Sequence, residues 1–168
     1  MFLNQKFCTA VLFTILSLGL TLLHAQTSAS WAINADNEYR VVPNIIYSTA
    51  NNYDCKLDVY ARIIPGASIP TVLYIHGGGW VTGSKESYVM NILPYLEMGL
   101  SVVNVEYRLA SVSLAPAAVE DCRLALRWIF KNAQQYGFDT TKVIVTGGSA
   151  GGHLALMTGM LQSVDIWR

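Results

Sequence analysis

The stretch Lys142-Val143-Ile144-Val145-Thr146-Gly147-Gly148-Ser149-Ala150-Gly151-Gly152-His153-Leu154-Ala155-Leu156 decides the fold of this chain. Lys142 to Val145 is short, β-branched and apolar, which predicts a strand covered on both faces. From Ala150 to Leu161, helix formers with apolar residues at helical spacing predict a helix. Between them, Gly147-x-Ser149-x-Gly151 matches the nucleophile elbow, a serine on a tight strand-to-helix turn. Such a turn strains the backbone and brings neighbouring segments close, which explains the glycines.

A serine on this turn has two interpretations. In the first, Ser149 is a nucleophile, and the following helix directs its N-terminal amides at the reacting centre, where negative charge develops. In the second, the segment is only a glycine-rich turn, and Ser149 is the N-cap of the helix. The predicted strand before it and the predicted helix after it favour the nucleophile.

A second motif, His76-Gly77-Gly78-Gly79-Trp80, follows another apolar segment, Thr71 to Ile75, which we predict to be a buried strand. In hydrolases with a nucleophile elbow, the oxyanion hole takes one amide from the residue after the serine and another from an HGGG-type loop. Both motifs stand here in the required order, each after a predicted strand. Together they predict a serine hydrolase, whereas either motif alone could be a plain turn.

The composition excludes other classes of function. The 168 residues suffice for one domain with a core, and 11 basic residues balance 11 acidic ones, giving a net charge of +0. The sequence has no basic patch, so we expect no nucleic-acid partner. No cysteine or histidine cluster has the spacing of a metal site, and we expect neither a metal ion nor a cofactor.

Met1 to Ala25 is typical of a secretory signal, with a positively charged start, an apolar run and a cleavage site expected before Gln26. An uncleaved membrane anchor is the alternative, because the apolar run has about the minimum length for spanning a bilayer. With cleavage, we expect a secreted or periplasmic protein without stable membrane association. A flexible lead-in over 26–37 and one domain over 38–168 are expected to follow.

Two cysteines remain after removal of the signal, Cys55 and Cys122. In an oxidising compartment they could pair, but their spacing does not show that they do. We predict two buried free thiols, because free cysteines are commonly buried.

The rest of the chain alternates between strands and helices. Predicted strands cover 39–47, broken at Pro43, then 55–62, 71–75, 101–105 and 142–145; predicted helices cover 88–97, interrupted by Pro94, then 116–137 and 150–161. Apolar residues alternate along 55–62, which predicts a strand exposed on its other face. The order β-β-β-α-β-α-β-α predicts an α/β fold, with a mostly parallel sheet, helices on both faces and an N-terminal antiparallel edge hairpin.

Taken together, these motifs resemble those of the α/β-hydrolase superfamily. Within it, the chain resembles the group that includes bifunctional feruloyl/acetyl-xylan esterases, kynurenine-formamidase-like enzymes and hormone-sensitive-lipase-like esterases. The specific matches are the blocks His76 to Trp80 and Gly147 to Ala155. Supporting matches are Leu57-Asp58-Val59-Tyr60, Glu106-Tyr107-Arg108-Leu109, Asp121 and Tyr136-Gly137-Phe138-Asp139.

The resemblance implies roles for the residues of the two motifs. Ser149 is implied to be the nucleophile that attacks an ester or amide carbonyl and forms an acyl-enzyme. The backbone amides of Gly78, Gly79 and Ala150 are implied to form the oxyanion hole. Trp80 is expected to shape the substrate pocket, with a packing role as the alternative.

Four other residues have expected structural roles. We expect His76 to orient its loop rather than to act as a base. His153 lies one helical turn after Ser149, and we expect it to be a packed helix residue. Arg108 and Asp121 are expected to pair and to tie the loop after a strand to the long helix.

The chain departs from the superfamily pattern at its end. The triad order should be serine, then an acidic residue, then histidine. After Ser149 the sequence contains only Asp165 and His153, and neither is well placed. We therefore expect the N-terminal part of a domain, about two-thirds of it, without the C-terminal strands and without activity of its own.

The leading hypothesis for function is an esterase that acts on acyl or acetyl esters of small alcohols or carbohydrates. A peptidase of the prolyl-oligopeptidase type would share the fold and the elbow, but the HGGGW loop favours esterases. A non-catalytic binding protein on the same scaffold is the third hypothesis, because fold alone does not determine function.

Overall fold

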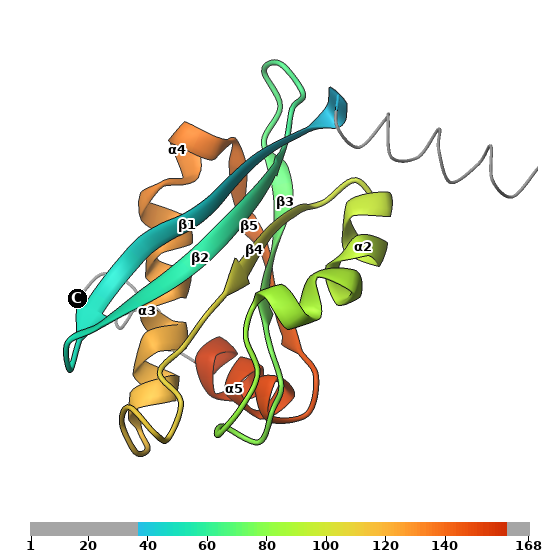
Figure 1. Ribbon diagram of the computed structural model, residues 1–168. Coiled ribbons are helices and arrows are strands. Elements are labelled where there is room, and N and C mark those ends of the chain that lie inside the picture. The colour runs from blue at the N-terminus through green and yellow to red at the C-terminus, as the bar shows by residue number, and fades with distance from the viewer. Residues whose placement is uncertain (1–36, 161–168) are drawn as a thin grey trace, which may run out of the picture. The chain divides into compact units, whose positions relative to one another are not determined.

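The computed structural model describes residues 37–160 (Figure 1). The strands are β1 (Tyr39–Ala50), β2 (Tyr53–Arg62), β3 (Ile69–Ile75), β4 (Ser101–Val105) and β5 (Phe138–Gly147). The helices are the 3-10 turn η1 (Glu86–Tyr88), then α2 (Val89–Glu97), α3 (Ala117–Lys131), α4 (Ala133–Tyr136) and α5 (Ala150–Gly159). Strands and helices alternate as predicted. The expected signal over 1–25 and the lead-in over 26–36 lie outside the described residues.

The strands form one mixed sheet in the order β1-β2-β4-β3-β5. Strand β3 pairs in parallel with both β4 and β5. The hairpin β1-β2 joins this parallel part through an antiparallel pairing of β2 with β4. Asn51 and Asn52, both with positive φ, make its tight turn. The predicted edge hairpin beside parallel strands is therefore confirmed.

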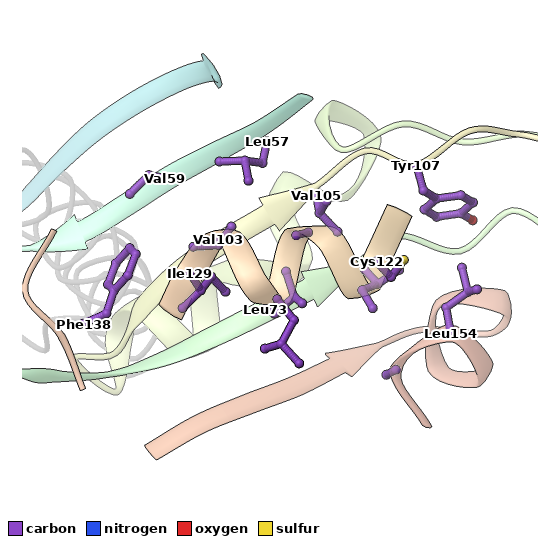
Figure 2. Packing of buried hydrophobic residues seen from close by; sticks show 14 of the residues in the cluster. Leu57, Val59, Leu73, Val103, Val105, Tyr107, Cys122, Ile129, Phe138 and Leu154 are labelled. Carbon is purple, nitrogen blue, oxygen red and sulfur yellow. The ribbon is translucent and has the colours of Figure 1, made fainter. Parts of the chain in front are cut away.

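Helices cover both faces of the sheet, as predicted. On one face, α3 and α5 pack against the larger apolar cluster, in which Leu57 and Val103 of the strands lie with Cys122 and Ile129 of α3 (Figure 2). On the other face, Ile92 and Leu96 of α2 share a smaller cluster with three strand residues, Val72, Tyr74 and Val102. Alternate residues of β3 thus reach opposite layers, as the two-residue period of a strand requires.

The prediction that the strand before the elbow is covered on both faces is wrong for the described residues. Ile144 is 47% exposed, and Lys142 is exposed as well. Val143 and Val145 point to the other side and pack against the larger cluster. The difference arises because β5 stands at the end of the strand order, where the cluster beneath α2 does not reach Ile144.

Pro43 and Pro94 do not break the strand and the helix that contain them, although the sequence predicted an interruption at each. Strand β1 continues past Pro43 through a register shift between Val42 and Ile45, so the missing N–H is accommodated at a bulge. Helix α2 contains Pro94 and continues to Glu97, with the Pro94 carbonyl accepting a bond from the Met98 amide at 3.1 Å.

The other helix ends follow the sequence more closely. The predicted helix over 116–137 divides at Asn132 into α3 and α4, and Gly137, with φ of 69°, ends α4 as expected. Gly99 follows α2 with φ of 79°, again as expected. At both positions glycine is suited to the left-handed conformation that ends a helix.

Candidate active site

Ser149 has the backbone conformation of a strained elbow. Its φ of 54° and ψ of −120° lie where residues with a side chain are rarely found. The residue is exposed and stands directly before α5. Its side chain makes no capping hydrogen bond, so the interpretation of Ser149 as an ordinary N-cap loses its main support.

The glycines around Ser149 allow three segments to cross. A Cβ atom at Gly147 would collide with the carbonyl oxygen of Ile75 at the end of β3. A Cβ atom at Gly151 would collide with the same oxygen and would lie 2.7 Å from the carbonyl oxygen of His76. The predicted close approach at the elbow is therefore confirmed, and it places the start of α5 against the end of β3.

The His76 loop lies beside the elbow because β3 and β5 are parallel neighbours. Ile75 stands opposite Gly147 in the register, so the two motifs leave the sheet side by side. A Cβ atom at Gly77 would lie 2.8 Å from the carbonyl oxygen of Gly148 and 3.5 Å from Cβ of Ser149. The topology thus brings together two motifs that stand far apart in the sequence.

Positive φ angles curl the loop over the next three residues, 115° at Gly78, 60° at Gly79 and 63° at Trp80. The Gly78 carbonyl accepts bonds from the amides of Val81 and Thr82 at 3.2 and 3.0 Å, which closes the curl. The amides of Gly78, Gly79 and Ala150 donate no hydrogen bond to any described residue. They are the three donors predicted for the oxyanion hole, a role that stays a prediction.

A mostly apolar cavity of about 270 Å³ lies next to this loop, between Trp80, His153 and the start of α3. Its wall includes Ala110, Pro116 and Val119. Trp80 is 42% exposed, and its indole meets the His153 ring edge-on, with ring centroids 5.4 Å apart. His153 is therefore exposed and in contact with Trp80, and the prediction of a packed helix residue is wrong. Its position on the first turn of α5 directs it to this cavity.

His76 lies fully buried beneath its loop. Its ring stacks on Tyr107 with centroids 4.3 Å apart, and the Tyr107 hydroxyl donates to the His76 carbonyl at 3.2 Å. Nδ1 lies 2.7 Å from the carbonyl oxygen of Gly77. These contacts support the expectation that His76 orients the loop.

Arg108 and Asp121 form the expected structural pair. Asp121 on α3 is fully buried, and its carboxylate receives Nη2 of Arg108 at 2.7 Å, Nε at 2.8 Å and the Arg108 amide at 2.9 Å. The hydrogen bonds that Arg108 donates to Asp121 raise the pKa of the guanidinium further. The pair connects the segment after β4 to α3, on one side of the cavity.

A second buried charge cluster was not expected from the sequence. Lys85 is 3% exposed, and its Nζ lies 2.9 Å from Oδ1 of Asp58 on β2. The Lys85 amide donates to Oε2 of Glu106 at 2.9 Å, and its carbonyl accepts from Asn104 at 2.8 Å. Asp58 is consequently buried, although the alternation along β2 had placed it on an exposed face. The sequence pointed to Asp58 only through its place in a predicted strand and in the supporting match Leu57 to Tyr60.

Within residues 37–160, no general base is hydrogen-bonded to Ser149. No hydrogen bond or ion pair joins its side chain to any of the described residues.

Cys55 and Cys122 are free and buried, as predicted, and burial raises the pKa of both thiols, that of Cys55 to about 12. Over 37–160 no group of three or more potential ligand residues could hold a metal ion. No helix in that range is long and apolar enough to cross a membrane.

Comparisons with known proteins point to esterases. A model of the BD-FAE family matches residues 57–166. Carboxylesterase NlhH of Mycobacterium tuberculosis is 33% identical over 114 residues, 65% of this chain and 36% of that protein. Probable carboxylesterase 5 of Arabidopsis thaliana is 32% identical over 152 residues, 78% of this chain and 47% of that protein.

Solved structures give the same result. An esterase from Pyrobaculum calidifontis superposes with a TM-score of 0.66 and 36% identity over 80% of this chain and 44% of its own. A bacterial heroin esterase superposes with a TM-score of 0.60 and 30% identity over 78% of this chain and 43% of its own. The chain spans less than half the length of each of these four proteins.

Proposed function

Because this chain belongs to the BD-FAE family and has the α/β-hydrolase fold of esterases, we propose that it is the nucleophile-bearing part of a serine esterase. The observation that carries the proposal is the juxtaposition of a strained, exposed Ser149 with a curled glycine loop whose amides have no partner among the described residues. Relatives named as carboxylesterases support hydrolysis of carboxylic esters.

The proposed reaction has two steps. Ser149 Oγ attacks the ester carbonyl carbon, and the amides of Gly78, Gly79 and Ala150 hold the oxyanion. The alcohol leaves, and water then hydrolyses the acyl-enzyme on Ser149. The serine proton must go to a base, and no base in 37–160 is hydrogen-bonded to Ser149. We propose that a histidine and an acidic residue outside this sequence complete the triad, as the order of triad residues in this fold requires.

The substrate is proposed to be an acyl or acetyl ester of a small alcohol or a carbohydrate. A cavity of about 270 Å³ beside Trp80 suits a short, mostly apolar group. Trp80 then forms one wall of this pocket, in contact with His153.

The proposed location is outside the cytoplasm, either secreted or periplasmic, because Met1 to Ala25 has the pattern of an export signal. N-terminal sequencing of the exported protein should begin at Gln26. Detection of Met1 in a membrane fraction would instead favour the alternative that Met1 to Ala25 is an uncleaved membrane anchor.

The direct test of the reaction is Ser149→Ala in the protein extended beyond Arg168, assayed with a short-chain nitrophenyl ester. We expect a loss of kcat of about 10⁶-fold with the fold intact. Ser87→Ala is the matched control, since Ser87 is also exposed but lies in η1. Retention of more than a few per cent of turnover in Ser149→Ala would place the nucleophile elsewhere.

The same assay separates the alternatives. Faster cleavage of a dipeptide anilide than of acyl esters would favour a peptidase. Failure of both substrates, together with failure of a fluorophosphonate to label the extended protein, would favour a binding protein on this scaffold.

A further inference from the structure

The His76 ring ends at an atom without a partner. A carbonyl oxygen only accepts hydrogen bonds, so the 2.7 Å contact with the Gly77 carbonyl places a proton on Nδ1. In the neutral ring Nε2 is then an acceptor. Nε2 is buried and has no hydrogen-bond partner among the described residues. The nearest charged group is Glu106, whose Oε1 lies 3.8 Å away.

Glu106 meets both ends of the oxyanion loop, which we define as residues 76–85. Its Oε2 accepts from the Lys85 amide at 2.9 Å, while its Oε1 faces Nε2 of His76. The loop between these contacts carries the unpartnered amides of Gly78 and Gly79. A single carboxyl group at the end of β4 therefore spans the base of the loop.

An ionised carboxylate and an imidazole nitrogen that accepts cannot hydrogen-bond to each other without a proton between them. We propose that Glu106 is a positioning residue of the oxyanion loop, and that its carboxyl group closes the 3.8 Å gap to Nε2 of His76 and shares one proton with it. The shared proton closes the base of the loop and holds the amides of Gly78 and Gly79 in one arrangement. When the shared proton is lost, the Glu106 carboxylate and Nε2 of His76 are two acceptors that face each other without a hydrogen bond. The oxyanion loop then becomes more mobile.

The surroundings of the pair suit a retained proton that can still exchange with solvent. Burial raises the pKa of the Glu106 carboxyl, and the amide of Lys85 opposes this shift. The carboxyl group is 14% exposed and borders a polar cavity of about 470 Å³. The charged and titratable groups around the pair are Tyr53, Asp54, Lys56, Lys85 and Glu86 beside Glu106, and Tyr88 and Tyr107 beside His76.

Three variants of this chain test the proposal through amide hydrogen exchange over residues 76–85, which requires no enzymatic activity. Glu106→Ala removes the acceptor for Lys85 and the partner of His76, and should raise exchange at the loop about tenfold or more. Glu106→Gln keeps the acceptor and offers an N–H to Nε2, so the loop should exchange as in the wild type. Glu86→Gln is the control, because that acid is 62% exposed.

The pH dependence adds a readout that a merely structural role would not give. Corrected for intrinsic rates, loop exchange in the wild type should rise as the shared proton is lost at higher pH. In Glu106→Gln it should be independent of pH over the same range. If Glu106→Ala does not fold, the pH dependence of loop exchange in the wild type and in Glu106→Gln is sufficient to test the proposal. Equal pH dependence in the two proteins, or Glu106→Gln as loose as Glu106→Ala, would overturn the proposal.

A further test uses the protein extended beyond Arg168, and its expected result rests on the proposed esterase function. There, Glu106→Ala should lower kcat about 10- to 100-fold. KM should change little, and Glu106→Gln should restore kcat. Loop exchange that follows the proposal in a protein without esterase turnover would contradict the esterase function alone. Normal kcat in Glu106→Ala would contradict the positioning role alone.

Discussion

Asp121 contributes strongly to the stability of the folded domain, because its carboxylate is fully buried and accepts several hydrogen bonds from Arg108. Breaking a buried pair from one side leaves the remaining charge without compensation. Loss of this one carboxylate therefore lowers the free energy of unfolding even where the backbone and the apolar core stay unchanged.

Asp121→Ala is therefore predicted to destabilise the domain by about 3 to 5 kcal/mol, measured by urea unfolding. Glu120→Ala is the matched control, because Glu120 is 59% exposed and lies 3.6 Å from the same guanidinium. The control should cost about 1 kcal/mol or less. Equal losses in the two variants would show that the burial of the pair does not matter.

The two thiols give a prediction that depends on pH. Burial raises the pKa of Cys55 to about 12 and raises that of Cys122 as well, against about 8.5 for an unfolded cysteine. Since the folded-state pKa is raised, the thiols contribute stability fully below about pH 8.5 and lose it as the pH rises toward the folded-state values. We expect the stability of the domain to fall between pH 8.5 and 11 and to fall less in Cys55→Ala.

Thiol counting checks the same residues. In a chain that begins at Gln26, neither thiol should react with a thiol reagent in the folded state at pH 8, and both should react after denaturation without reductant. A denatured protein without free thiols would instead indicate a disulfide between Cys55 and Cys122.

Some of these residues could be predicted and others could not, for a physical reason. Ser149 and its glycines could be predicted, because a tight turn imposes its requirements on consecutive residues. Lys85 and Asp58 could not, since their pairing joins residues 27 positions apart, and a lysine beside a glutamate is typical of a solvated helix start. Burial of such a charge depends on the fold and not on local pattern.

At the scale of elements, the junction of β5 and α5 determines the site. The helix starts against the end of β3, and both contacts rely on glycine at 147 and 151. The order of the elements followed from apolar periodicity. The exposure of β5 did not, because it depends on which helices reach the edge of the sheet.

Gly151→Ala should destabilise the domain by about 1 to 3 kcal/mol, because its methyl group has to displace the backbone of Ile75 and His76. Gly159→Ala tests the same substitution in the same helix without a clash, since a Cβ atom there has nothing within 4 Å. It should leave the stability of the domain nearly unchanged, with a gain of less than about 1 kcal/mol, because Gly159 is the last residue of α5. Thermal unfolding of both variants gives the comparison, and a stabilised Gly151→Ala would contradict the crossing.

At the scale of the whole molecule, the described residues hold the proposed nucleophile, Ser149, and the proposed oxyanion donors, and none of them is hydrogen-bonded to the Ser149 side chain as a base. The family and the fold could be recognised from two motifs in their strand–loop–helix context. The partners of Ser149 could not, because in this fold they follow later strands.

Met1 to Arg168 alone is accordingly predicted to show no esterase turnover above background. Loss of the base in a serine hydrolase costs about 10⁶-fold in kcat. Of the three histidines, His24 belongs to the expected signal, His76 is buried, and His153 contacts Trp80. Saturable hydrolysis of a nitrophenyl ester by this chain, abolished by His153→Ala, would make His153 the base.

Covalent labelling tests the proposed role of Ser149 as the nucleophile. The extended protein is treated with a fluorophosphonate, and the adduct is located by peptide mass spectrometry. We predict one adduct, on the peptide that contains Ser149, and none after Ser149→Ala. An adduct on another residue, or equal labelling of the alanine variant, would contradict the role of Ser149 as the nucleophile.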